Sequence, residues 1–239
     1  MSFYIIGDLH GGAVGDGKKL NNKEVWKACG DKYPDFVIVC GDFGYIFAPE
    51  SNKKALRQEL YNLLWLEEKP FKILFCDGNH ECFDRLNKLP SEFMFGSDVG
   101  VVNKNVFHLR RGRVYHIDNK SFFVMGGASS IDKEDRILGI SYWADEVPDY
   151  NDFNRANKNL DMYEGKVDYV LSHACPVAVK SLIHTYKWLY PDPTEDLLSA
   201  LDERLTYKKW FFGHYHLDKE VSIGSKNYQC LYKRGYYVE

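Results

Sequence analysis

The sequence opens with a short apolar run that leads directly into a carboxylate and an imidazole. Residues 3–6 are typical of a buried β-strand, and Asp8, Leu9 and His10 follow after a single glycine. Side chains two apart on an extended segment point the same way, so we expect Asp8 and His10 to face one point while Leu9 returns to the core. The pair predicts half of a metal site at the carboxyl end of a strand, where open α/β sheets place their chemistry.

Four later apolar runs end in the same kind of residue. These runs are residues 36–40, 71–76, 167–171 and 210–212. The metal-type side chains that follow them are Asp42, Asn79, His80, His173, His214 and His216. Five of the eight histidines therefore lie at strand ends, which favours a metal site over isolated structural histidines. We expect a paired or solvated structural role for the other three, which are His108, His116 and His184.

Strand and helix patterns alternate along the first third of the chain. Helical spacing at residues 22–30 and 53–68 between apolar runs indicates βαβ units and a parallel sheet. We expect one apolar stripe on the second helix, made of Leu56, Leu60, Leu63, Leu64 and Trp65. Short β-like runs between residues 106 and 127 predict antiparallel strands of a second sheet. Helices are expected near residues 151–164 and 194–205, before two or three closing β-runs, and we predict one domain over residues 1–239.

Composition narrows the class of protein. The chain has 239 residues, of which 45% are hydrophobic and 27% charged, as in ordinary soluble proteins. A net charge of -3 does not favour extended nucleic-acid binding. No apolar run approaches the ~20 residues of a membrane helix, and the start lacks the pattern of a signal peptide. The six cysteines include no Cys-x-x-Cys pair, so we expect a reduced, cytoplasmic protein.

The candidate ligands are oxygen and nitrogen atoms, without any cysteine. That set suits Mn²⁺ best, with Fe or Zn²⁺ as alternatives. Seven candidates exceed the needs of one four- to six-coordinate ion but suit two, and Asp42, central in the order, can bridge them. Two divalent ions, two aspartates and a bridging hydroxide leave a charge of about +1, which would attract phosphate and favour ionisation of water.

The five motifs together resemble the signature of the calcineurin-like metallophosphoesterases, in their bacterial or phage-type form. The matching segments are Gly7-Asp8-Leu9-His10, Gly41-Asp42, Gly78-Asn79-His80-Glu81, Ser172-His173 and Gly213-His214-Tyr215-His216. The resemblance extends from residue 7 to residue 216. It implies a four-layer α/β/β/α sandwich with two central mixed sheets and a binuclear metal site at its edge.

The resemblance also implies a role for each ligand. One metal would be held by Asp8, His10, Asp42 and His216. The other would be held by Asp42, Asn79, His173 and His214. His80 would contact the phosphate and protonate the leaving oxygen, with Glu81 orienting its ring. Imidazole is chemically suited to that role near neutral pH.

Two further regions bear on the site. Tyr45 stands where the family usually carries a second Asp, which affects support of the site and not the metal count. The segment 126–148 resembles a loop that borders the active site in bacterial and phage-type members. Arg136 there could contact phosphate or be a solvated charge, and Lys133 offers a second cation. Tyr142 and Trp143 could stack on a ligand, although Trp143 could equally belong to the core.

These features predict a binuclear metal-dependent phosphoesterase, either a phosphatase or a phosphodiesterase. It would hydrolyse phosphate mono- or diesters by in-line attack of a metal-bound hydroxide, on a small phosphorylated substrate such as a nucleotide. One alternative is a catalytically silent scaffold of the same fold, although such a protein would be expected to lose ligands or His80. The other is a DNA nuclease of the family, although no basic groove or extra domain is evident.

Overall fold

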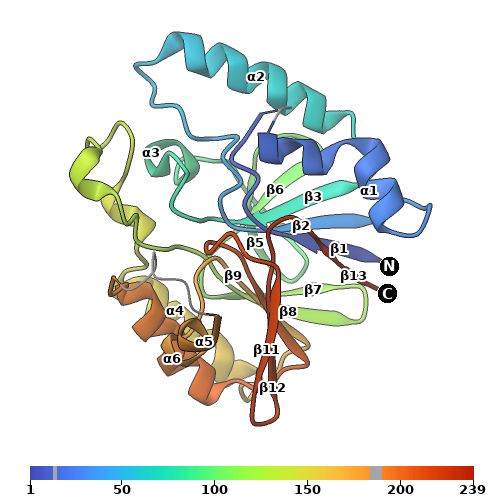
Figure 1. The fold of residues 1–239 in the computed structure, drawn as a ribbon, viewed down its shortest axis with the longest axis vertical. Helices are drawn as coiled ribbons and strands as arrows, with labels where there is room; N and C mark the ends of the chain where they lie inside the picture. The colour runs from blue at the N-terminus through green and yellow to red at the C-terminus, as the bar shows by residue number, and fades with distance from the viewer. Residues whose placement is uncertain (13–14, 184–189) are drawn as a thin grey trace.

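The computed structural model describes residues 1–12, 15–183 and 190–239. Within these ranges two β-sheets pack face to face, and helices cover their outer faces (Figure 1). This is the four-layer α/β/β/α sandwich with two mixed sheets that we predicted. His184, which we expected to be structural, lies outside the described residues.

The first sheet has seven strands among the described residues, in the order β13-β1-β2-β3-β6-β5-β4. β1, β2, β3 and β6 run parallel, and β13, β5 and β4 are added antiparallel at the two edges. The central strands are apolar along nearly their whole length because both faces of the sheet are covered. The strands are β1 (Phe3–Ile6), β2 (Phe36–Cys40), β3 (Lys72–Cys76), β4 (Ser91–Met94), β5 (Ser97–Val101), β6 (Val106–Leu109) and β13 (Tyr236–Val238).

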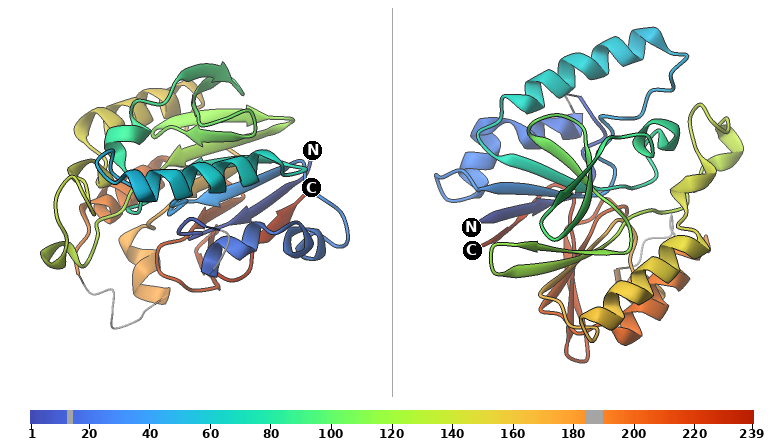
Figure 2. Two further views of the ribbon diagram at one scale, coloured as in Figure 1. Left: turned by 90° about the horizontal axis from the view of Figure 1, so that it is seen from above. Right: turned by 180° about the vertical axis from the view of Figure 1, so that it is seen from behind.

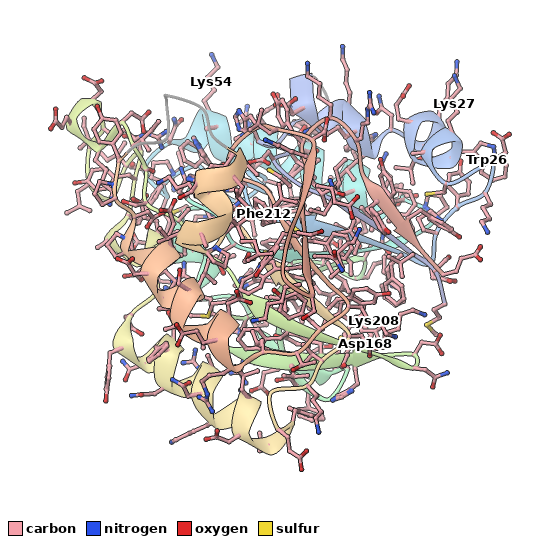
Figure 3. The ribbon with its side chains drawn as sticks, turned by 60° about the horizontal axis from the view of Figure 1, so that its bottom comes forward. Trp26, Lys27, Lys54, Asp168, Lys208 and Phe212 are labelled. Atoms are coloured by element: carbon pink, nitrogen blue, oxygen red, sulfur yellow. The ribbon has the colours of Figure 1, made fainter. Side chains whose placement is uncertain are left out.

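The second sheet has six strands in the part of the chain that the structure describes, in the order β11-β12-β10-β9-β8-β7. β8, β9, β10 and β12 are parallel, and β7 and β11 are antiparallel edges. Asp168 links the starts of β8 and β10. Its carboxylate accepts a 2.9 Å hydrogen bond from the Ser121 amide and lies 2.7 Å from Lys208 Nζ (Figure 3). The strands are β7 (Arg113–Ile117), β8 (Lys120–Met125), β9 (Tyr169–Ser172), β10 (Lys209–Phe212), β11 (Lys219–Ile223) and β12 (Lys226–Cys230).

Helices form the two outer layers (Figures 1 and 2). The first sheet is covered by α1 (Asn22–Ala28), α2 (Lys53–Glu67) and α3 (Phe83–Leu86). The second sheet is covered by α4 (Tyr150–Met162), α5 (Val177–Ile183) and α6 (Pro193–Arg204). Three short 3₁₀ turns complete the described elements: η1 (Gly15–Leu20), η2 (Lys133–Asp135) and η3 (Ala144–Glu146). No described helix is both long and apolar enough to span a bilayer.

The strands contribute to two apolar layers at once because successive side chains point to opposite faces. On β1, Phe3 and Ile5 face the second sheet, where they join a cluster with Phe122 and Phe211. Ile6 belongs to the opposite cluster, beneath the helices of the first sheet. A third cluster fills the space between the second sheet and its helices, and Phe212 is fully buried in it. This alternation explains why continuous apolar runs predicted buried parallel strands correctly.

Four elements differ from the sequence-based expectation. β6 belongs to the first sheet, where it pairs parallel with β3, and not to the antiparallel strands of the second sheet. The β4–β5 hairpin and α5 were not expected. β6 was assigned wrongly because it lies close in sequence to β7 and β8, and closeness in sequence does not show which sheet a strand joins.

The apolar stripe expected on α2 is only partly correct. Leu60 and Leu64 are 57% and 50% exposed, whereas Leu66 and the acidic Glu59 are buried. Glu59 accepts hydrogen bonds from the amides of residues 47 and 48 and pairs with Arg85. The inner face of α2 therefore contributes an ionic link to the loop after β2, which a hydrophobic pattern does not reveal.

We predict that Glu59→Ala lowers the free energy of unfolding by about 1–3 kcal/mol, because it leaves buried donors without an acceptor. Denaturant unfolding followed by circular dichroism measures this change. Gln58→Ala is the matched control, since the adjacent side chain is exposed and its hydrogen bond is to another side chain of the same helix, Asn62. Equal stability of the Glu59→Ala and Gln58→Ala variants would contradict the prediction.

Candidate metal centre

The predicted ligands lie on five loops, each at the carboxyl end of a parallel strand. Three loops follow β1, β2 and β3 of the first sheet, and two follow β9 and β10 of the second. Face-to-face packing brings these strand ends together, so that residues far apart in sequence converge. The converging residues are Asp8, His10, Asp42, Asn79, His173, His214 and His216.

Five of these residues have a left-handed backbone, which differs from the extended segment expected at Asp8 and His10. Their φ angles lie between 48° and 67°: Asp8, His10, Asp42, His214 and His216. A non-glycine residue in this region costs about 1–3 kcal/mol, so surrounding contacts must hold it. The amides of Leu9 and His10 both donate to the Asp42 carbonyl oxygen at 2.9 Å. Leu9 is buried and Asp8 and His10 meet as predicted, but through a turn and not a strand.

Glycines beside the ligands allow the loops to approach closely. A Cβ atom at Gly78 would lie 2.3 Å from Asp42 Oδ1. A Cβ atom at Gly213 would lie 2.6 Å from Asp8 Oδ2. Both distances are too short for a carbon and an oxygen that are not bonded, so any larger residue would displace a carboxylate.

Asp42 lies at the centre of the site, and its two carboxylate oxygens face different histidines. Oδ1 lies 3.1 Å from His173 Nε2. Oδ2 lies 3.7 Å from His10 Nδ1 and 4.0 Å from His80 Nε2. Oδ1 also accepts 2.9 Å hydrogen bonds from the amides of Asn79 and His80. A buried carboxylate in this position can bridge two cations.

Two groups of ligand atoms flank Asp42. On one side, His216 Nε2 lies 3.0 Å from His10 Nε2 and 3.6 Å from Asp8 Oδ1. On the other side, His173 Nε2 lies 3.2 Å from Asn79 Oδ1. Among the described residues, three sets have ligand atoms within 4.8 Å of one another: Asp8 with His10 and His216, Asp42 with His10 and His80, and Asp8 with Asp42 and His173.

Hydrogen bonds orient two of the ligands toward this centre. His173 Nδ1 lies 2.9 Å from the Cys40 carbonyl oxygen, to which it donates, so Nε2 faces the site. The Asn79 amide nitrogen donates to Ser130 Oγ at 3.1 Å, which turns the Asn79 carbonyl oxygen inward. Ser130 in turn bonds to the buried Glu146 at 2.8 Å. Sequence analysis missed Ser130 because it lies far from every ligand motif.

His214 is buried beside His173, with ring centroids 4.8 Å apart. Its amide donates to both carboxylate oxygens of Asp8, at 3.0 and 3.1 Å. The residue also lines a pocket of about 510 Å³ together with Ser130 and Glu195. His214 is therefore buried next to two of the predicted ligands, although it belongs to none of the three sets above.

His80 and Arg136 meet at the mouth of the site. Arg136 Nη2 lies 3.3 Å from His80 Nε2, and its Nε lies 2.8 Å from Asp132 Oδ1. Arg136 also donates to the Ser141 carbonyl oxygen at 3.1 Å. The His80 side chain is 28% exposed, and the Phe47 ring lies 5.7 Å from it. Arg136 is thus a fixed cation beside the candidate ligands and not a freely solvated charge.

Glu81 is fully buried, and its carboxylate binds backbone groups instead of the His80 ring. Oε1 accepts hydrogen bonds from the amides of Phe43 and Gly44, at 2.8 and 3.3 Å. Oε2 accepts one from the Gly78 amide at 2.8 Å. We therefore correct the expected role: Glu81 joins the loops after β2 and β3, and acts on His80 only through the backbone.

Trp143 belongs to the core. It is 4% exposed, its indole nitrogen donates to Asp84 Oδ2 at 3.1 Å, and its ring packs against Phe47. The burial leaves no free face for stacking on a ligand, so the expected substrate contact by Trp143 is wrong. Lys133 is also occupied, since its ammonium lies 2.9 Å from the buried Glu146. The partly buried Phe47 is the aromatic side chain that the structure places next to His80.

Tyr45 stands where the family usually carries a second Asp, and it makes a hydrogen bond of its own to a neighbouring loop. Its side chain is 1% exposed, and its hydroxyl donates to the Gly12 carbonyl oxygen at 2.7 Å. Burial raises the pKa of this hydroxyl, so the phenol stays protonated and remains a donor. Tyr45 therefore connects the loop after β2 to the loop after β1.

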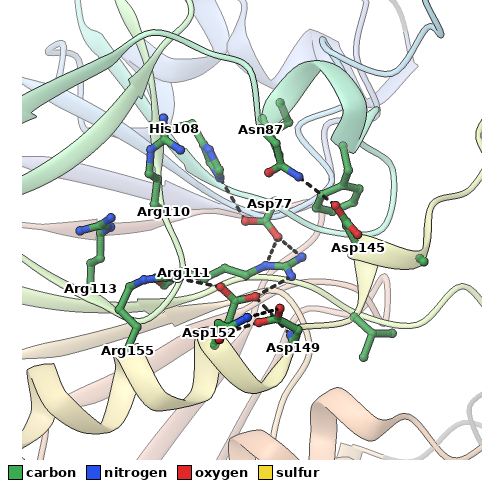
Figure 4. A pocket seen from close by; sticks show the side chains of 15 residues that line it. Asp77, Asn87, His108, Arg110, Arg111, Arg113, Asp145, Asp149, Asp152 and Arg155 are labelled. Carbon is green, nitrogen blue, oxygen red and sulfur yellow. Dashed lines mark hydrogen bonds and ion pairs between the residues drawn. The ribbon is translucent and has the colours of Figure 1, made fainter.

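A buried ion-pair network supports the loop that carries Asn79 (Figure 4). Asp77 accepts a 2.7 Å hydrogen bond from Arg111 Nε and lies 3.0 Å from His108 Nε2. Burial tends to raise the pKa of Asp77, but Arg111 outweighs it and holds the carboxyl ionised. Arg111 also reaches Asp152 at 3.3 Å, at the rim of a pocket of about 550 Å³. His108 is thus the paired structural histidine that we predicted.

Burial and crowding perturb the ionisation of the ligands. Burial raises the pKa of Asp8 to about 8, and nearby His173 offsets this only in part. Burial also lowers the pKa of His10 to about 4. The pKa of His173 is instead raised to about 10. Burial alone would lower it, but the attraction of the Asp42 carboxylate for the protonated ring is the stronger effect.

The donor set fits divalent metal ions. The Nε2 atoms of His10 and His216 lie 3.0 Å apart, a separation that two ligands of one ion can have. Asp8 Oδ1 lies 3.6 Å from His216 Nε2, and Asp42 Oδ2 lies 3.7 Å from Nδ1, the other ring nitrogen of His10. Oxygen and imidazole ligands without thiolates are typical of Mn²⁺, Fe and Zn²⁺ sites. These side chains therefore form a candidate His/Asp metal site.

Fold and site together define a metallophosphoesterase-type sandwich, with a His/Asp cluster at the carboxyl ends of strands from both sheets. A family model for calcineurin-like phosphoesterases matches residues 1–218. The chain therefore belongs to the calcineurin-like phosphoesterase family. Comparison with curated proteins gives no match.

Three of the solved structures that are similar to this chain are as follows. Phosphopantetheinyl hydrolase (PptH) from Mycobacterium tuberculosis is 15% identical with a TM-score of 0.46, covering 97% of this chain and 90% of that one. GAP50, the anchor in the inner membrane complex of Plasmodium, is 12% identical with a TM-score of 0.47, covering 97% and 71%. A putative 5'-nucleotidase from Staphylococcus aureus is 12% identical with a TM-score of 0.46, covering 98% and 49%. Likenesses this distant carry no argument about activity.

We predict that the protein binds Mn²⁺ more tightly as the pH rises from about 6 to about 8, since binding displaces protons. Asp8 and His173 have pKa values of about 8 and about 10 before a cation binds. At pH values below the pKa of a ligand group, the proton that metal binding displaces from it makes the apparent association constant rise about tenfold per pH unit. Calorimetric titration in buffers of different ionisation enthalpy measures both the affinity and the proton release. A constant affinity without proton release over this range would contradict the prediction.

Proposed function

We propose that this protein is a binuclear metal-dependent hydrolase of phosphate mono- or diesters. One ion would be held by Asp8, His10, Asp42 and His216. The other would be held by Asp42, Asn79, His173 and His214. The observation that carries the proposal is the placement of Asp42, whose two oxygens lie 3.1 Å from His173 and 3.7 Å from His10 in separate ligand groups.

Mn²⁺ is the ion we propose first, with Fe or Zn²⁺ as alternatives, because the ligands are oxygen and imidazole atoms. When bound, two such ions lower the pKa of water and neutralise charge on a phosphate in an in-line displacement. The protein positions the ligands beforehand. Asp42 is held by two amides, His173 by the Cys40 carbonyl, and Asn79 by Ser130.

His80 and Arg136 are proposed to act on the phosphate and on the leaving group. His80 is partly exposed beside Asp42, so its Nε2 can reach a phosphate at the centre. In that position it can donate a proton to the leaving oxygen. Arg136 can donate to phosphate oxygens from the same side, since its Nη2 already lies 3.3 Å from His80.

The substrate we propose is a small phosphorylated compound, with a nucleotide as one example. The net charge of -3 gives little attraction for a long polyanion, so extended nucleic-acid binding is not favoured. Burial of Trp143 removes one argument for a nucleotide, and the partly buried Phe47 beside His80 is another aromatic candidate. We also propose a cytoplasmic location, which the free state of all six cysteines supports.

Two other functions fit the fold. A catalytically silent scaffold would need no intact ligand set, and every predicted ligand is present in this sequence. A DNA nuclease would need a basic groove around the centre. The nearby pocket beside His214 is instead rich in carboxylates, including Asp132, Asp192 and Glu195. Both observations favour the small-molecule phosphoesterase.

We predict that His80→Ala retains the metal content of the wild type and lowers turnover of an alkyl phosphate about 10²–10⁴-fold. The loss on p-nitrophenyl phosphate should be smaller, because p-nitrophenolate leaves without being protonated. Steady-state kinetics on both esters, with elemental analysis of the same samples, measures the effect. His116→Ala is the matched control, since this exposed histidine lies on β7.

The outcomes separate the possible roles. Equal losses of turnover on the two esters would mean that His80 contacts the phosphate but does not protonate the leaving group. Loss of metal from His80→Ala would make it a ligand instead. If the metal-loaded wild type hydrolyses no mono- or diester, the scaffold alternative replaces the proposed function.

A further inference from the structure

His216 is more exposed than two of the other histidine ligands. Its side chain is 43% accessible, against 25% for His10 and 0% for His173. His173 also differs because its Nδ1 is held by a carbonyl oxygen. Among the described residues, His216 Nδ1 makes no such hydrogen bond. A ligand histidine normally needs a second contact that fixes its ring and tautomer. The contact that meets the His216 ring is an aromatic one.

Tyr232 stacks on the His216 ring. The two ring centroids lie 4.5 Å apart, and the planes are inclined by only 6°. The Tyr232 hydroxyl donates to Asp16 Oδ2 at 3.2 Å, and its amide donates to Asp218 Oδ1 at 2.8 Å. Tyr232 is therefore fixed at both ends, and its ring can hold the imidazole in one orientation.

Lys19 connects this stack to a second ligand. Its Nζ lies 4.2 Å from the centroid of the Tyr232 ring. The same Nζ donates to the carbonyl oxygens of Asp8 and Gly7, at 2.8 and 3.2 Å. The Lys19 side chain is 12% exposed and also pairs with Asp16 at 3.8 Å. One ammonium group therefore contacts the ring behind His216 and the backbone of Asp8.

We propose that Tyr232 and Lys19 are positioning residues for the metal ion bound by Asp8 and His216. This inference rests on the proposed binuclear function and adds two residues outside the ligand motifs. Both contacts act through ligands: Tyr232 fixes the His216 ring, and Lys19 fixes the Asp8 backbone in its left-handed turn.

The stack also favours the metal-bound state. An imidazole that shares its lone pair with a cation becomes electron-poor, and the electron-rich face of a phenol attracts it more strongly. Tyr232 therefore contributes both orientation and affinity. The stack should affect only the binding of the ion held by His216. The ion held by His173 should bind as before, because a separate hydrogen bond fixes the His173 ring.

The test compares Mn²⁺ binding without any substrate. Calorimetric titration of the full-length protein, freed of metal, should show one of two steps weakened about 10–100-fold in Tyr232→Leu. Tyr232→Phe keeps the stack and loses only the bond to Asp16, so its affinities should stay near the wild type. Lys19→Met should weaken the same step as Tyr232→Leu, and provides the test should the latter fold poorly.

The matched control is Tyr236→Leu. Tyr236 also packs on an aromatic ring, that of Phe211, and has Lys209 Nζ 4.5 Å from its centroid. It lies on β13 and packs against the apolar cluster between the two sheets. Equal weakening by Tyr236→Leu, or unchanged binding in both Tyr232→Leu and Lys19→Met, would overturn the inference while leaving two ions on the wild type. A wild type that bound no Mn²⁺ would overturn the proposed function as well.

Discussion

The Asp42 carboxylate contacts ligand loops of both sheets, and the common site depends on it. Its Oδ1 atom accepts hydrogen bonds from the amides of Asn79 and His80, on a loop of the first sheet, and faces His173 of the second. Its Oδ2 atom faces His10. A buried anion needs nearby positive charge, since transfer of an unpaired carboxylate from water costs far more than one hydrogen bond returns. In the absence of a metal, a proton on His173 partly meets this need. Two metal ions, one near each oxygen, would supply this positive charge. The carboxylate that links the loops would therefore also favour metal binding.

The site combines backbone strain with dense hydrogen bonding. Five ligands adopt left-handed conformations, each at a cost of about 1–3 kcal/mol, and they persist because neighbouring loops hold them. Glu81 accepts three amides from two loops, Tyr45 bonds to Gly12, and Arg111 fixes Asp77 directly before the Asn79 loop. None of these groups is a proposed ligand. Together they pre-form the ligand geometry before any ion binds, which is what rapid and specific metal binding requires.

The ligand positions could be predicted from sequence because an apolar run followed by Asp or His marks a strand end. Parallel strands bring such ends to one edge, which predicted the convergence of the ligands, whereas the sandwich and the grouping of Asp8 with His216 were implied by the family resemblance. The failures involve contacts that sequence spacing does not encode. The sheet joined by β6, the burial of Trp143 and the backbone role of Glu81 depend on which distant residues face them. Tyr232 lies 16 residues after His216 and carries no motif, so only the folded chain shows the stack.

The central claim is that Asp42 serves two metal ions at once, and metal counting tests it most directly. Equilibrium dialysis against Mn²⁺ with elemental analysis should find two ions per chain in the wild type. Asp42→Asn should reduce binding at both positions, because one substitution removes the charge that they share. Asp118→Asn is the control, since Asp118 pairs with the amino terminus and belongs to none of the three ligand sets. No more than one ion on the wild type, or two ions retained by Asp42→Asn, would contradict the account.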